Sequence, residues 1–115
     1  MTKREATETL EHVFPGCEVS AHYDRSCGCY VALVWSPYTA PGACCDVSSY
    51  VGTGYEMALA VLADTMHDRA LSCAAFGDDE AATWYRNGAF SLVASTKGED
   101  AGRKLFDAIS AQASR

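Results

Sequence analysis

Apolar residues recur at helical spacing near the start of the chain, and charged residues fall between them. Thr2, with Glu5 three residues later, forms the capping-box arrangement that opens a helix. A Pro-Gly pair at positions 15–16 is a signal that ends one. The pattern therefore predicts an N-terminal amphipathic helix, whose buried stripe consists of Ala6, Leu10, Val13 and Phe14.

The next segments change to the two-residue period of strands. Residues 17–24 alternate apolar and polar side chains, which indicates a strand with one buried face. Residues 29–35 are apolar on both faces and predict a central strand. Residues 25–28 are the expected turn between them, residues 36–45 a loop because of their prolines, and residues 47–51 a short third strand.

A second helix is indicated by another capping pair, Thr53 and Glu56. Its end is left open by the pattern. We expect an end near Arg69, but helical spacing continues as far as a capping Gly77, and residues 71–76 also fit a short strand. The predicted buried stripe consists of Tyr55, Leu59, Leu62 and Met66.

An Asn-Gly pair at positions 87–88 lies between two apolar segments, 82–86 and 89–94. This predicts a second hairpin, because Asn-Gly suits a type I′ turn, in which both central residues have positive φ. The alternative is a helix over residues 79–86, closed by Gly88. A last helix is predicted over residues 98–112, with Thr96 and Glu99 as its capping pair and Ala101, Leu105, Phe106 and Ile109 toward the core.

The element order α-β-β-(β)-α-β-β-α predicts an α+β fold. We expect an antiparallel sheet of about four to five strands, with two hairpins, packed against two to three helices. The 115 residues should form a single compact domain, 1–115. Leu33 on the central strand and Leu62 on the second helix are predicted to be fully buried.

The opening order α-β-β-β-α resembles the double-stranded-RNA-binding fold in outline. Domains of that kind bind RNA through basic contacts to phosphate and 2′-hydroxyl groups. This chain has nine Lys and Arg against fifteen Asp and Glu, a net charge of −6. The charge argues against direct contact with nucleic acid or with an anionic membrane surface.

The N-terminal segment has no apolar stretch of the kind found in secretory leaders, and no run approaches the about 20 apolar residues of a membrane span. We therefore expect a cytoplasmic location. In a reducing compartment, the six cysteines are expected to be thiols or metal ligands.

Four cysteines form a candidate zinc site. Cys27 and Cys29 lie at the predicted hairpin turn, and Cys44 and Cys45 lie in the loop. If the turn and the loop meet, four thiolates satisfy tetrahedral zinc, with His22 as a substitute ligand. The spacing differs from the pairs two to four residues apart in familiar zinc motifs, so we expect no cofactor and keep zinc as the alternative.

Acidic and aromatic residues form the other candidate site. An acidic block at 78–80 precedes an aromatic pair at 84–85, and two further acids follow at 99–100. The predicted hairpin would bring these acids to one end of the sheet. Aromatic residues frequently contribute most of the binding energy at protein interfaces. The predicted partner-binding residues are Asp78, Asp79, Glu80, Trp84, Tyr85, Glu99 and Asp100.

These features predict a small, acidic, non-catalytic module that binds a basic protein partner. Short acidic chains without catalytic motifs are typical of phage- or plasmid-encoded inhibitors. Among these are anti-defence proteins that mimic nucleic acid by presenting carboxylates in place of phosphates. The alternatives are a cysteine-rich zinc-binding protein and a small enzyme whose chemistry no motif identifies. A homo-oligomer also remains open.

Overall fold

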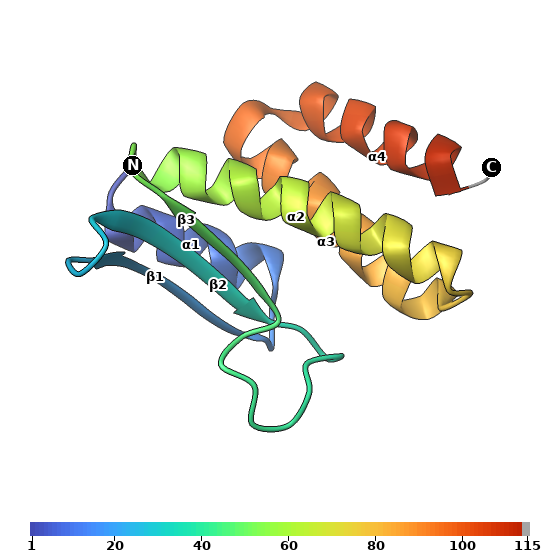
Figure 1. Ribbon diagram of the computed structural model, residues 1–115. Helices are drawn as coiled ribbons and strands as arrows, with labels where there is room; N and C mark the ends of the chain where they lie inside the picture. The colour runs from blue at the N-terminus through green and yellow to red at the C-terminus, as the bar shows by residue number, and fades with distance from the viewer. Residues whose placement is uncertain (114–115) are drawn as a thin grey trace. The chain divides into compact units, whose positions relative to one another are not determined.

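The computed structural model describes residues 1–113, in which three strands form one antiparallel sheet and four helices accompany them (Figure 1). The α+β class is confirmed, but the sheet has fewer strands than the four to five predicted. Contacts divide the chain into two compact units, Met1–Leu62 and Ala63–Arg115. Helix α2 (Tyr55–Ala75) belongs to both units. A single compact domain over residues 1–115 stays a prediction.

The elements of the first unit agree with the sequence pattern. They are α1 (Lys3–Val13), β1 (Glu18–Asp24), β2 (Cys29–Trp35), β3 (Val47–Val51) and the first turns of α2. The capping box of α1 is present, because the Thr2 hydroxyl accepts from the Glu5 N–H at 3.2 Å and the Glu5 carboxylate accepts from the Thr2 N–H at 3.1 Å. The strands pair in the order β1-β2-β3.

One face of the sheet is buried by the start of α2. The face carries Val34 on the central strand and Val47 opposite it on β3, and both are fully buried. The Ser49 hydroxyl donates to the Ala58 carbonyl of α2 at 2.6 Å. The rings of Tyr30 and Tyr55 meet edge to face, with centroids 4.9 Å apart. These contacts fix the position of the first turns of α2 on the sheet.

The prediction of full burial is confirmed for Leu62, which is completely inaccessible to solvent, and wrong for Leu33, which is half-buried. Leu33 alternates onto the opposite face of β2 from Val34, away from α2. Val31 on that same face is nevertheless fully buried, and its partners in the register are His22 on β1 and Tyr50 on β3.

Helix α2 is longer than the preferred prediction, and it ends at Ala75 instead of near Arg69. Gly77, with φ of 80°, reverses the chain. Its N–H donates to the Ala74 carbonyl at 3.1 Å, and the next N–H, of Asp78, donates to the Cys73 carbonyl at 2.9 Å. This pair of bonds is a Schellman motif, so Gly77 acts as the helix-ending glycine of the alternative interpretation.

The second hairpin prediction is wrong, because residues 79–97 form one helix, α3 (Asp79–Lys97). The Asn87-Gly88 pair lies inside it, with helical backbone and Gly88 buried. The apolar residues of this segment also recur at helical spacing, and their burial on one face outweighs the local turn preference. The buried residues of α3 are Ala81, Tyr85, Gly88, Ala89 and Leu92.

Helix α4 (Glu99–Ala113) follows directly, with Gly98 at φ of 99° between the two helices. The predicted capping role of Thr96 is wrong, because its hydroxyl donates to the Leu92 carbonyl inside α3 at 2.9 Å. The rings of Phe90 and Phe106, 5.7 Å apart, join α3 to α4. The two helices therefore form a tightly connected helical hairpin.

We expect Gly102→Ala to destabilise this hairpin by about 1 kcal/mol or more in urea unfolding. A Cβ at this position would lie 2.8 Å from the Phe90 carbonyl oxygen and 3.0 Å from the Ala94 Cβ. Overpacking of this kind costs about 1–3 kcal/mol, which exceeds the gain of about 1 kcal/mol that alanine normally brings to a helix. Gly52→Ala is the control, since a Cβ added there would meet no atom within 4 Å. An increase in stability for Gly102→Ala would contradict the close helix contact.

Candidate functional site

The turn between α2 and α3 joins an exposed aromatic ring to an acidic block. We call residues 76–80 the α2–α3 corner (Figure 1). Phe76, directly after the last residue of α2, is 89% exposed, the largest value among the exposed large hydrophobic side chains. Gly77 turns the chain, and the three acids that follow, Asp78, Asp79 and Glu80, are all exposed. The corner therefore presents one apolar ring beside three carboxylates.

Each acid of the α2–α3 corner has a structural reason to stand where it does. The Asp78 carboxylate caps α3 by accepting from the Ala81 N–H at 3.2 Å. Asp79 and Glu80 occupy the first turn, where the helix dipole favours negative charge. None of the three forms an ion pair with a cation within residues 1–113. Their charge is thus available to an external group.

The aromatic pair that the sequence offers as contact residues divides between core and surface. Tyr85 is 2% exposed and is the largest of the fully buried side chains, so it is not accessible to a partner. Trp84 is half-buried, with its ring edge to face against Tyr85 at 5.1 Å. A contact role for Trp84 stays a prediction. Because consecutive residues of a helix point in different directions, Tyr85 enters the core while Trp84 stays half-buried. The strand predicted from the sequence does not decide which of the two is buried.

Glu99 and Asp100 do not lie with the other acids, contrary to the predicted arrangement at one end of a sheet. They form the first turn of α4, after the C-terminal end of α3. The acidic block at 78–80 lies at the N-terminal end of α3, which has 19 residues and spans about 28 Å. The two acidic groups are therefore separated by a helix length.

The candidate zinc ligands are also separated. Cys27 lies in the turn before β2 and Cys29 is the first residue of the strand, whereas Cys44 and Cys45 lie in the loop after its end. Figure 1 shows this turn and this loop at opposite ends of β2. The register confirms the separation, because Val47 pairs with Val34 near the far end of the strand. A seven-residue strand spans about 20 Å, so the turn and the loop do not meet, and the condition for a four-cysteine site is not fulfilled. Within residues 1–113, His, Cys, Asp and Glu side chains form no group of three or more that would hold a metal.

The environments of three cysteines favour the protonated thiol. The cysteines form no disulfide within residues 1–113. The hydrogen bond with the Cys29 thiol raises the pKa of Cys27, and burial raises the pKa of both Cys17 and Cys45. Because the thiolate is the reactive species, these three side chains are poorly suited to act as nucleophiles at neutral pH.

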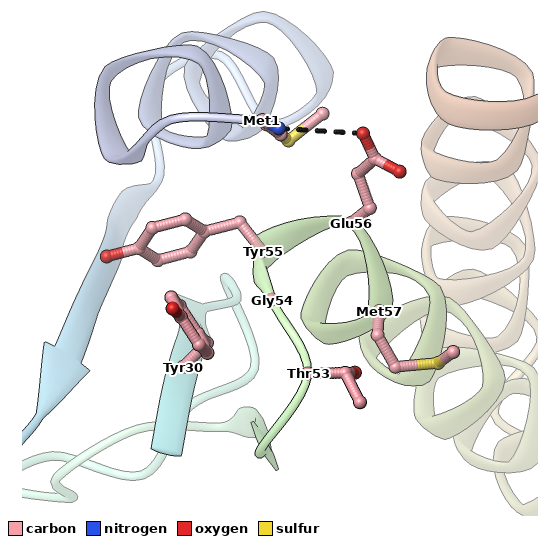
Figure 2. A pocket seen from close by; sticks show the side chains of 7 residues that line it. All are labelled: Met1, Tyr30, Thr53, Gly54, Tyr55, Glu56 and Met57. Carbon is pink, nitrogen blue, oxygen red and sulfur yellow. Dashed lines mark ion pairs between the residues drawn. The ribbon is translucent and has the colours of Figure 1, made fainter. Parts of the chain in front are cut away.

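A cavity of about 460 Å³ opens at the start of α2 (Figure 2). The Met1 ammonium nitrogen and the Glu56 carboxylate lie 3.6 Å apart at its edge. Burial raises the pKa of Tyr55, so this phenol stays neutral at physiological pH. The cavity offers an aromatic and thioether surface with one internally paired charge couple. Its lining residues are Met1, Tyr30, Thr53, Gly54, Tyr55, Glu56 and Met57.

Comparison with protein families, with curated proteins and with solved structures finds no match to this chain. None of the helices described between residues 1 and 113 has the length and apolar character needed to cross a membrane.

Sequence reasoning missed Phe76 and Arg86, which lines a second cavity on α3. The sequence pattern leaves Phe76 in a segment that fits either a helix or a strand, and neither assignment predicts its exposure. Arg86 has no local signal, because the two residues that it contacts, Phe106 and Ser110, belong to α4.

Proposed function

We propose that this protein is a small, acidic, non-catalytic protein-binding module, and that the α2–α3 corner contacts a basic partner. The 89% exposure of Phe76 is the observation that carries the proposal. Covering an apolar ring that is exposed to water lowers the free energy of the complex. Buried aromatic side chains also frequently contribute most of the binding energy at interfaces.

The charge of the corner supports a basic partner over other proteins. Three consecutive carboxylates follow the exposed ring, and the whole chain has a net charge of −6. Negative potential steers a basic protein during encounter and disfavours acidic competitors. Because Asp79 and Glu80 also stabilise the start of α3, the acids are held on an ordered helix end.

An inhibitor of a nucleic-acid-binding protein is the more specific form of this proposal. Such an inhibitor, of the phage or plasmid anti-defence type, would place carboxylates where its target binds phosphates. The acids at 78–80 support it, and Glu99 and Asp100 offer a second group about one α3 length away. A target with two basic patches could contact both groups.

The test is affinity capture from the source cells with three forms of the protein as bait. We expect the unchanged protein and Tyr50→Ser to retain the same partner, and Phe76→Ser to retain at least tenfold less of it. Tyr50 is the matched control, since it is an aromatic side chain 55% exposed on the sheet. Thermal unfolding should confirm that both variants fold, because exposed substitutions change stability by only about 0.5 kcal/mol.

Equal retention by Phe76→Ser and the unchanged protein would show that the corner is not the contact surface. Loss of the partner from Tyr50→Ser alone would instead assign the contact to the sheet.

A further inference from the structure

A second cavity, of about 280 Å³, lies within the unit Ala63–Arg115. One wall is apolar and is formed by alanines of α2 and α3 together with Ile109 of α4. The polar lining comes from Asp79, Thr83 and Arg86 on α3 and from Ser110 on α4. The cavity thus places one cation and one carboxylate beside hydroxyl groups and a small apolar surface.

Arg86 is held in this cavity by a hydroxyl group and an aromatic ring, without an ion pair. Its Nη1 donates to the Ser110 hydroxyl at 3.3 Å, and its guanidinium carbon lies 4.6 Å from the centroid of the Phe106 ring. Its Nε is buried and has no hydrogen-bond partner among the described residues. Arg86 forms no ion pair with a described carboxylate. A half-buried guanidinium whose buried Nε–H has no acceptor is unfavourable, and an anion bound in the cavity would relieve this.

The shape of the guanidinium selects the class of anion. Its planar edge donates two parallel hydrogen bonds that match the two oxygens of a carboxylate. The cavity has about the volume of nine water molecules at about 30 Å³ each, so only a short ligand fits. The apolar wall suits a hydrocarbon chain attached to the carboxylate.

The Asp79 carboxylate limits how much negative charge a ligand in this cavity can carry. It lies two helical turns before Arg86 on α3, about 10.5 Å along the axis, and both residues line the cavity. Its carboxylate disfavours a second negative charge on the ligand. We infer that this cavity binds a small aliphatic monocarboxylate, with the carboxylate on the Arg86 guanidinium and the chain against the alanine and Ile109 wall.

Butyrate is the probe that tests this site. The full chain, labelled with ¹⁵N, is titrated with butyrate up to about 50 mM, a range that includes the millimolar affinity expected of so few atoms. We expect a saturable shift of the Arg86 Nε–H signal and of the backbone signals of Thr83 and Ser110. Absence of a saturable shift over this range would overturn the proposal.

Two arginine variants separate this site from general charge effects. Arg86→Met should weaken butyrate binding at least tenfold, and Arg86→Lys should weaken it as well, because lysine keeps the charge but loses the planar edge. Arg103→Met is the matched control, since Arg103 lies over the same Phe106 ring at 5.5 Å without lining the cavity. Equal losses of butyrate affinity in Arg86→Met and Arg103→Met would overturn the assignment of the site to Arg86. The amide spectrum of each variant reports whether it folds, and Arg86→Lys provides the test if Arg86→Met does not.

Charge selectivity gives an independent test of ligand class. Inorganic phosphate should bind at least several-fold more weakly than butyrate, and Asp79→Asn should reduce this difference. Phosphate binding as tight as butyrate binding would overturn the choice of a monocarboxylate. None of these measurements uses a protein partner, so they stand or fall separately from the proposed function.

Discussion

Replacing Tyr85 with alanine is expected to lower the free energy of unfolding by about 3–5 kcal/mol. The side chain is 2% exposed, and the Arg69 guanidinium lies 5.8 Å from its ring centroid. Removing it leaves a cavity in the core around α3 and exposes groups that the ring now covers. Since small proteins are stable by only about 5–15 kcal/mol in total, the loss is a large fraction of the whole.

Urea unfolding of Tyr85→Ala beside Tyr50→Ala measures this effect. Tyr50 is 55% exposed, so its replacement should change the free energy of unfolding by about 0.5 kcal/mol or less. Similar small changes for the two variants would contradict the helical placement of Tyr85 in the core and restore it as a surface contact residue.

The second large effect is expected for charge at the α2–α3 corner. Changing Asp79 and Glu80 to lysine moves the net charge from −6 to −2, because each reversal adds two units. The association rate with the captured basic partner should fall at least tenfold at low salt, since the first charges that the partner meets become repulsive. Asp78 is kept, because losing this N-cap would cost about 1 kcal/mol of stability.

The matched control is the double reversal of Glu99 and Asp100 to lysine. It makes the same change in net charge, also in the first turn of a helix, but at the other end of α3. Stopped-flow measurements in 0.1 M and 1 M salt should show the difference vanishing at high salt, as the screening length falls from about 10 Å to about 3 Å. Equal slowing by the two double reversals would mean that net charge, and not the corner, governs association.

The first unit was predictable because each of its elements has a strong local signal. The capping residues of α1 and the alternation in β1 and β2 determine structure without help from distant residues. In α3 two local signals conflict, since Asn87-Gly88 favours a turn while the apolar spacing favours a helix. Packing decides between them, because Gly88 is buried on the same face as Tyr85 and Leu92.

The candidate sites were harder to predict because they depend on where the elements end. The residues of the cysteine pairs were correctly placed in a turn and a loop, but a seven-residue strand holds those two segments apart. The acids are separated in the same way, because a helix stands where the hairpin was predicted. Arg86 meets Ser110 across 24 positions of sequence, a pairing that no periodicity in either segment encodes.

Helix α2 continues across the boundary between the two units, so we expect their stabilities to depend on each other. The boundary between Leu62 and Ala63 divides its 21 residues into segments of 8 and 13. Isolated helices shorter than about 12–15 residues are only marginally stable in water, so either half would fray if the other lost its support. Unfolding that starts in the sheet would therefore spread along α2 toward the α2–α3 corner, and the chain should melt cooperatively instead of one unit at a time.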